Sequence, residues 1–213
     1  MNTESFLRQR LICVAVIDQP DDAVPLAEAL LAGGLNVMEV TFRTAGAADA
    51  ISRIRDRVPR ISIGAGTLLS AEQVKQAAGA GAQFGVSPDL NESVLAEAER
   101  RELPFFPGVM TPTEVGHALE IGCKHLKFFP AEAAGGVAMV KALAGPFSHT
   151  GVKFVPTGGL NAANLANYLA VPQVAAIGGS WMAERKLVKE EAWARITALT
   201  AEALKVIAAA QVK

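Results

Sequence analysis

Short apolar runs alternate with longer amphipathic stretches from one end of the chain to the other. The runs are rich in valine, isoleucine and phenylalanine, which favour strands, whereas the stretches between them place alanine, leucine and glutamate at helical spacing. The runs predict strands at Leu11–Ile17, Val37–Thr41, Ser62–Ala65, Phe84–Ser87, Phe105–Val109, His125–Phe129, Lys153–Pro156 and Val174–Ile177. The stretches predict helices at about 21–33, 46–58, 70–80, 91–101, 112–121, 136–144, 161–170 and 190–209, with N-caps at Asp21, Ser70, Asn91, Thr111 and Asn161.

Strict alternation of strand and helix, with no linker or low-complexity tract, predicts a parallel sheet that is covered by helices. Eight such units are the number that closes a (β/α)8 (TIM) barrel, and 213 residues suit one such domain. We therefore expect an α/β fold in which residues 1–213 form a single barrel and residues 1–10 add an N-terminal helical extension. A doubly wound open sheet would show the same alternation, because counting units does not prove closure.

The composition argues against several classes of protein. A formal net charge of -1 and a pI near 6.3 favour neither nucleic acid nor an anionic membrane as a partner. The first residues lack the segments of a secretory signal, and no apolar run is long enough to span a membrane. Cys13 and Cys123 have no metal-type or redox-type spacing, and His117, His125 and His149 have no partner at helical spacing. We expect a soluble, cytoplasmic protein with reduced thiols and no metal.

The second predicted strand carries polar side chains on one face. Glu39, Thr41 and Arg43 share parity, so their side chains project together. In a barrel that face is the interior, where a carboxylate needs a partner or a purpose. Two interpretations stay open: an internal ion pair between Glu39 and Arg43 that ties strands together, or a group that takes part in catalysis.

Lys127 lies among aromatic residues in the sixth predicted strand. A permanently charged ammonium is costly in such a place, and a lysine that is neutral part of the time can attack a ketone. The alternative is a lysine whose head group extends to solvent at the strand end. Because Glu39 also faces inward, the two residues together favour chemistry. A carboxylate beside the amine can shuttle the protons that carbinolamine formation and carbon–carbon cleavage require.

Glycines and small polar residues gather where other predicted strands end. Gly66 allows close backbone approach and Thr67 offers a hydroxyl, while Pro88 makes a rigid turn after the fourth strand. Paired glycines follow the seventh and eighth strands, in Thr157-Gly158-Gly159 and Gly178-Gly179-Ser180. Such loops are typical of a phosphate site in a barrel, although ordinary tight turns would look the same. The dinucleotide and P-loop patterns are both incomplete.

Taken in order, these segments make the chain similar to the 2-keto-3-deoxy-6-phosphogluconate (KDPG) / 4-hydroxy-2-oxoglutarate (KHG) aldolase family over essentially its whole length. The segment around Lys127 is the distinctive one, and the ordered set is specific. The matching segments are Ala32-Gly33-Gly34, Glu39-Val40-Thr41-Phe42-Arg43-Thr44, Gly64-Ala65-Gly66-Thr67, Gly81-Ala82-Gln83-Phe84, Lys127-Phe128-Phe129-Pro130-Ala131-Glu132, Pro156-Thr157-Gly158-Gly159 and Gly178-Gly179-Ser180-Trp181.

The resemblance implies a cytoplasmic class I aldolase of the Entner-Doudoroff pathway, with no metal or cofactor and usually a homotrimer. Such a lyase cleaves KDPG to pyruvate and glyceraldehyde 3-phosphate, and in some members KHG to pyruvate and glyoxylate. It implies a Schiff base on Lys127 and general acid/base catalysis by Glu39. The other roles that it implies are carboxylate binding by Arg43 and Thr67, apolar walls at Pro88 and Phe129, and phosphate binding at Thr157, Gly158, Gly159, Gly179 and Ser180.

One position departs from the family pattern, and two other functions compete with it. Relatives often have glycine where this chain has Asp89, which puts a carboxylate at the rim and bears on the choice of sugar. A phosphosugar isomerase or epimerase on the same fold would share the glycine loops but would need no lysine among aromatic residues. A non-catalytic phosphosugar-binding protein would keep those loops without needing Glu39 and Lys127 to face each other.

Overall fold

The computed structural model describes residues 3–211 and shows an α/β fold in which all registered strand pairs are parallel. The predicted parallel architecture is therefore confirmed. The strands are β1 (Leu11–Ala15), β2 (Val37–Thr41), β3 (Ser62–Gly66), β4 (Gly85–Val86), β5 (Phe105–Phe106), β6 (Gly108–Val109), β7 (His125–Phe128), β8 (Lys153–Pro156) and β9 (Ile177–Gly179). Those at β2 and β8 have the predicted bounds.

The strands form two sheets, one of six strands in the order β5-β4-β3-β2-β1-β9 and one of three in the order β6-β7-β8. The prediction of one strand over Phe105–Val109 is wrong, because Pro107 has no N–H for a ladder and separates β5 from β6. The predicted eighth strand is also displaced: Val174 makes only an isolated bridge, and β9 starts at Ile177. Bridges from Phe154 to Val174 and from Thr157 to Gly178 connect the two sheets.

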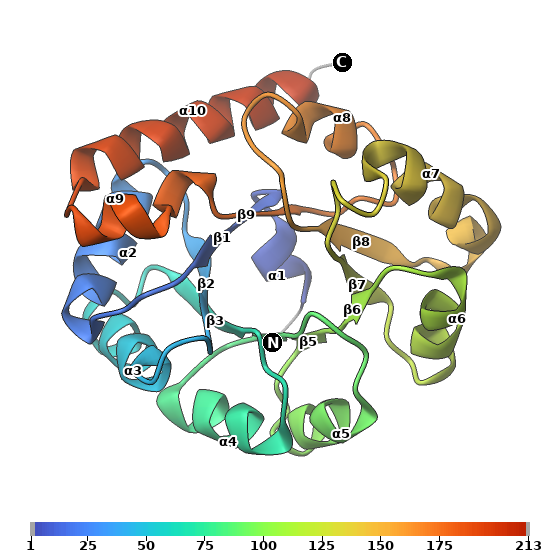
Figure 1. Cartoon of the computed structure of the whole chain (residues 1–213), viewed down its shortest axis with the longest axis horizontal. Helices are drawn as coiled ribbons and strands as arrows, with labels where there is room; N and C mark the ends of the chain where they lie inside the picture. The colour runs from blue at the N-terminus through green and yellow to red at the C-terminus, as the bar shows by residue number, and fades with distance from the viewer. Residues whose placement is uncertain (1–2, 212–213) are drawn as a thin grey trace.

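Helices surround the strands, as Figure 1 shows. They are α1 (Glu4–Leu7), α2 (Ala23–Ala32), α3 (Ala47–Arg57), α4 (Ala71–Ala80), α5 (Glu92–Arg100), α6 (Pro112–Glu120), α7 (Gly136–Phe147), α8 (Leu165–Leu169), α9 (Arg185–Lys189) and α10 (Trp193–Gln211), with short 3-10 turns at η1 (Pro20–Asp22), η2 (Ser148–Thr150) and η3 (Trp181–Ala183). Within residues 3–211 no helix is long and apolar enough to cross a bilayer.

Three of the five predicted N-caps are confirmed, because Ser70, Asn91 and Thr111 each accept a hydrogen bond from the first turn of their helix. Thr111 and Glu114 complete a capping box. The prediction at Asp21 is wrong, since a 3-10 turn begins at Pro20 and the cap of α2 is Asp22, without a side-chain bond. Asn161 instead closes a turn by accepting from the Ala163 N–H, and α8 starts later than predicted.

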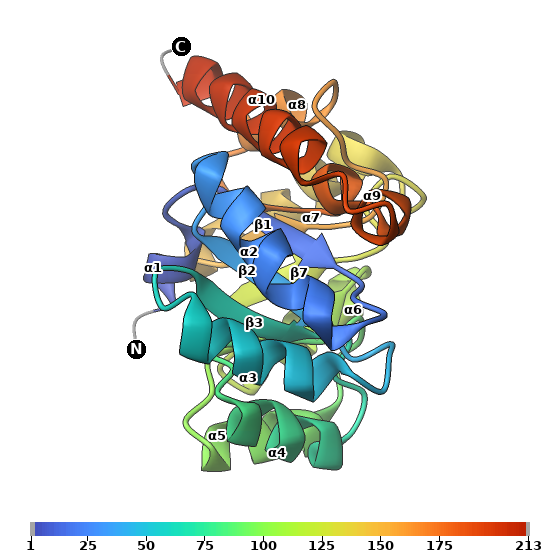
Figure 2. The ribbon, with the colours of Figure 1, turned by 90° about the vertical axis from the view of Figure 1, so that its left-hand side faces the viewer.

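The N-terminal helix covers one end of the ring of strands. Figure 1 shows α1 near the middle of that ring, and Figure 2 shows it on the side opposite α9. Phe6 of α1 is buried and packs on Phe84, with ring centroids 4.8 Å apart. Phe84 in turn meets Phe106 edge to face. This aromatic column closes the amino-terminal end, which leaves the carboxyl ends of the strands as the open side. Met1 and Asn2 of the predicted extension lie outside the described residues.

Candidate active site

Lys127 on β7 and Glu39 on β2 point at each other across the interior. The Lys127 Nζ lies 3.9 Å from the Glu39 Oε1. Both residues are buried, with exposed fractions of 6% for Lys127 and 3% for Glu39. The alternative interpretation, an internal ion pair between Glu39 and Arg43, is wrong: Arg43 lies in the turn after β2 and is exposed. The structure therefore places the carboxylate beside the amine, and not beside the guanidinium.

Burial raises the pKa of the Glu39 carboxyl above its ordinary value, and the nearby Lys127 offsets this only in part. Its Oε1 is sealed from solvent and has no hydrogen-bond partner among the described residues. The missing side chain of Gly66 gives the carboxylate its room, since a Cβ there would lie 2.6 Å from the Glu39 Oε1. A carboxyl that holds its proton more readily than usual suits general acid/base work.

Lys127 has an apolar and aromatic setting. Its Nζ lies 5.2 Å from the centre of the Phe129 ring, within cation–π range. Gly108 of β6 is its partner in the register of the parallel pair, so no side chain crowds the lysine from that strand. A Cβ at Gly108 would come within 2.2 Å of the Pro88 backbone. The glycine therefore also allows Pro88, one of the predicted apolar walls, to pack closely against β6.

All the side chains and glycines predicted for the site line one cavity of about 590 Å³ at the carboxyl ends of the strands. They are Glu39, Arg43, Thr67, Pro88, Lys127, Phe129, Thr157, Gly158, Gly159, Gly179 and Ser180. The volume suits a small sugar acid. Residues far apart in the sequence thus meet in one place, as expected from the carboxyl ends of parallel strands.

Thr67 has an uncommon backbone. Its φ of 58° is in the left-handed region, which is a genuine outlier for a β-branched residue. The residue follows Gly66 at the end of β3 and borders the cavity. Conformations of this kind cost about 1–3 kcal/mol and gather at ligand sites, where the fold holds a group in place. The strain points to a positional requirement on the Thr67 hydroxyl.

The two glycine loops lie side by side at the other end of the cavity. Gly158 and Gly159 have φ angles of 104° and 79°, which L side chains rarely adopt. The loop after β7 fastens them, because the Ala131 N–H donates to the Thr157 carbonyl at 2.8 Å and the Glu132 N–H donates to the Gly158 carbonyl at 3.1 Å. Ser180 follows β9 and is exposed. These loops offer a rigid frame and an exposed hydroxyl.

In the described part of the chain no α-helix begins directly after either loop, although the predicted helix at 161–170 would have placed its N-terminus close to Gly159. After Gly159 the next helix, α8, begins only at Leu165 and has five residues. After Ser180 comes the three-residue turn η3. Helix dipoles therefore add little at this end of the cavity, and recognition of an anion falls to backbone amides, Ser180 and any nearby cation.

Thr41 and Arg185 are among the residues of the cavity that were not predicted. Thr41 is buried, and its hydroxyl has no hydrogen-bond partner among the described residues. Its parity with Glu39 was a signal in the sequence. Arg185 also lines the cavity and forms an ion pair with Asp18. Only its position five residues after Ser180 hinted at a cation near the glycine loops.

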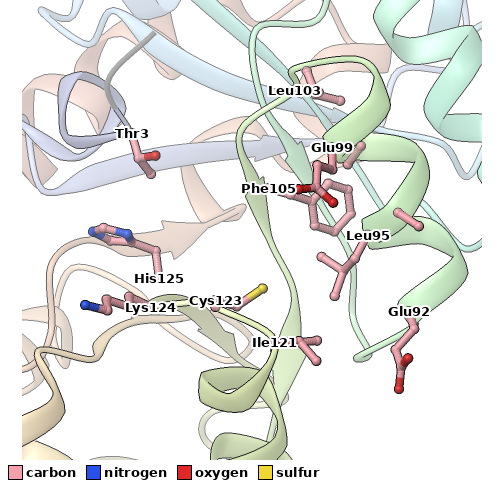
Figure 3. Close-up of a pocket in the computed structure, with 13 residues that line it drawn as sticks. Thr3, Glu92, Leu95, Glu99, Leu103, Phe105, Ile121, Cys123, Lys124 and His125 are labelled. Atoms are coloured by element: carbon pink, nitrogen blue, oxygen red, sulfur yellow. The ribbon is translucent and has the colours of Figure 1, made fainter.

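A second cavity of about 540 Å³ lies between α5 and the start of β7. Figure 3 shows Cys123, Lys124 and His125 on one side of it, with Leu95, Leu103 and Phe105 on the other. Burial raises the pKa of the Cys123 thiol, which keeps it protonated and unreactive. The buried amine and carboxyl that lie 3.9 Å apart line the other cavity, so we place the chemistry around Lys127. Cys13 and Cys123 are both free thiols, as predicted.

The described residues contain no group of three or more histidine, cysteine, aspartate or glutamate side chains placed to hold a metal ion. The three histidines do not come together at the cavity around Lys127. His117 pairs instead with Glu92 on the outer helices, at 2.8 Å.

The family model for KDPG and KHG aldolase matches residues 3–199. The chain is 47% identical over 204 residues to the 2-dehydro-3-deoxy-phosphogluconate aldolase of Treponema pallidum, with 96% of each chain covered. It is 45% identical over 194 residues to the KHG/KDPG aldolase of Escherichia coli K12, with 91% of this chain and 90% of the relative covered.

Solved structures agree with this. The KDPG aldolase of Legionella pneumophila, with pyruvate captured as a covalent carbinolamine intermediate, superposes with a TM-score of 0.90 at 41% identity and covers 94% of this chain and 97% of its own. The aldolase of Zymomonas mobilis with 3-phosphoglycerate gives a TM-score of 0.85 at 41% identity, covering 94% and 93%. A thiamine phosphate pyrophosphorylase of Pyrococcus furiosus, at 15% identity and a TM-score of 0.69, shares the fold alone.

Proposed function

The chain belongs to the KDPG and KHG aldolase family, and we propose that it is a class I aldolase that cleaves KDPG to pyruvate and glyceraldehyde 3-phosphate, with KHG as a second substrate. The observation that carries the proposal is the buried amine of Lys127 at 3.9 Å from the carboxyl of Glu39. An isomerase would need acid/base groups but no amine nucleophile, and a binding protein would need neither.

The proposed reaction begins when the Lys127 Nζ attacks the C2 ketone of the substrate. Loss of water from the carbinolamine gives a protonated Schiff base, which acts as an electron sink. Glu39 takes the proton from the C4 hydroxyl, the C3–C4 bond breaks, and the aldehyde leaves while the electron pair remains on an enamine. Protonation at C3 and hydrolysis then release pyruvate and free the lysine. The raised pKa of the Glu39 carboxyl suits both the acceptance and the return of a proton.

The remaining residues of the cavity divide between the two ends of the substrate. Arg43 and Thr67 would hold the carboxylate next to C2, and Pro88 and Phe129 would form apolar walls around the pyruvyl unit. At the far end, the distal phosphate would lie against Thr157, Gly158, Gly159, Gly179 and Ser180. The positive φ angles of Gly158 and Gly159 support this, because both residues line the cavity in a conformation that glycine favours, and without side chains they let a ligand approach the backbone closely.

Three further features belong to the same proposal. We infer that the two sheets make one closed (β/α)8 barrel, since bridges connect β8 to β9 and only Pro107 separates β5 from β6. The Lys127 mechanism needs no metal or cofactor. The homotrimer and the cytoplasmic location stay predictions from the family resemblance.

Reduction with borohydride in the presence of pyruvate tests the proposal. It should add one pyruvyl unit at Lys127, and peptide mapping would locate it. Lys153, whose Nζ donates to the Pro172 carbonyl at 3.1 Å, is the internal control for non-specific labelling. The adduct should still form after treatment with a strong chelator. Absence of an adduct, or an adduct at Lys153, would overturn the assignment.

A further inference from the structure

The cavity holds a cation near the phosphate loops that the sequence pattern did not reveal. Arg43 and the amine of Lys127 lie at the pyruvate end, whereas Arg185 lines the same cavity beside the loop that carries Ser180. The turn η3 comes directly after Ser180, and α9, whose first residue is Arg185, comes next. The glycine loops supply only neutral amides at this end of the cavity. The positive charge there comes from Arg185, and the neighbouring Glu184 adds a negative charge.

Asp18, in the loop after β1, holds the Arg185 guanidinium in a fixed orientation. The Nε donates to the Asp18 Oδ2 at 2.6 Å, and the Nη2 donates to the Asp18 Oδ1. This two-point contact is the geometry in which a guanidinium fork matches a carboxylate. The bond to Arg185 holds the pKa of the Asp18 carboxyl below its ordinary range, so the pair is charged at neutral pH.

The contact with Asp18 leaves part of the fork available. A guanidinium has five N–H groups, and Asp18 engages the Nε and one side of the Nη2. No other side chain or carbonyl among the described residues is bonded to Arg185. The side chains are 60% exposed for Arg185 and 38% exposed for Asp18, so an incoming anion can reach the free edge without unpacking the fold.

We propose that Arg185 is a specificity-determining residue that binds the distal phosphate of the substrate opposite the Gly158-Gly159 loop, with Asp18 as the residue that positions it. This inference rests on the proposed aldolase function. A phosphate dianion gains from a charged donor that an unphosphorylated substrate cannot use, so Arg185 favours phosphorylated keto-deoxy acids over KHG.

The test compares Arg185→Gln with Lys189→Gln, using KDPG and KHG as substrates. Lys189 lies on the same helix near Asp18 but does not line the cavity, so it controls for loss of one positive charge. Arg185→Gln should lower the ratio of kcat/KM for KDPG to that for KHG by about tenfold or more, through KM, because a charge-assisted hydrogen bond is lost. Arg185→Lys should recover part of that ratio, and Lys189→Gln should leave it within about twofold.

The outcomes separate this inference from the proposed function. An unchanged ratio in Arg185→Gln, or an equal fall in Lys189→Gln, would overturn the role of Arg185. If Arg185→Gln folds poorly, the salt dependence of the ratio in the unmodified protein gives a second measurement: a ratio that does not fall as ionic strength rises contradicts a charged contact. Formation of the pyruvyl adduct at Lys127 does not involve phosphate, so its failure would instead count against the aldolase assignment.

Discussion

Lys127 and Glu39 come from strands on different sheets, β7 and β2, yet the Lys127 Nζ and the Glu39 Oε1 lie 3.9 Å apart, and both side chains are buried. Glu39→Gln keeps the shape of the side chain and removes its proton transfer, so kcat should fall by about 10²–10⁴-fold. Steady-state kinetics with KDPG would measure the fall. Retained turnover would mean that the carboxylate only balances the charge of the lysine.

The same substitution should affect stability in a pH-dependent way. The pKa of Glu39 is raised in the fold, so the folded protein holds this proton more tightly than the unfolded chain. Its stabilising contribution is therefore present below the unfolded pKa of about 4.3 and is lost as pH rises through the folded value. Glu39→Gln has no proton to lose at this position. The unfolding free energy of the variant minus that of the unmodified protein should therefore be larger at pH 7 than near pH 4. Urea unfolding at the two pH values checks this, and a pH-independent difference would contradict it.

Ser180→Ala should weaken the binding of KDPG much more than the binding of KHG. The Ser180 hydroxyl is exposed and has no hydrogen-bond partner within residues 3–211, and a hydrogen bond to a charged phosphate contributes about 1.5–3 kcal/mol. Kinetics on both substrates would show the difference, and an equal loss on the two would mean that the loop only shapes the rim. Gly159→Ala is a poorer probe, because its Cβ would come within 2.7 Å of the Glu132 Cβ and displace the loop.

Thr67→Asn should separate backbone strain from side-chain chemistry. Asparagine tolerates the left-handed conformation that Thr67 adopts, so the unfolding free energy should stay the same or rise by up to about 1 kcal/mol. If the Thr67 hydroxyl holds the pyruvyl carboxylate, kcat/KM should fall for KDPG and KHG alike. A loss confined to KDPG would place Thr67 at the wrong end of the substrate.

Thr41→Val should not destabilise the protein, in contrast with most changes at buried sites. The Thr41 hydroxyl has no partner among the described residues, and an unsatisfied buried hydroxyl costs about 1–3 kcal/mol. Thr200→Val is the matched control, because the equally buried Thr200 hydroxyl donates to the Ile196 carbonyl at 2.8 Å. In urea unfolding, Thr41→Val should lower the free energy of unfolding less than Thr200→Val does. The reverse order would mean that Thr41 has a partner in solution.

Local patterns located most of the elements and the residues that line the cavity, and failed where distant contacts decide. Apolar runs located β2 and β8, because a buried strand needs continuous hydrophobic residues wherever it lies. The predicted helix at 190–209 starts instead at Trp193, after a turn in which Glu191 has a φ of 51°. The role that we infer for Arg185 depends on Asp18, which lies 167 residues away in the chain. No sequence window contains that contact.

The break at Pro107 also divides the chemistry of the chain. Glu39, Arg43 and Thr67 precede it, whereas Lys127 and the glycine loops follow it, so the acid/base group and the nucleophile lie on pieces of similar length. Neither piece alone carries a complete reaction centre. β9 of the second piece pairs with β1 of the first, which gives the two a surface on which to reassemble. We expect the two pieces, expressed as separate polypeptides, to form a split enzyme in which aldol cleavage reports on the association of the two fragments.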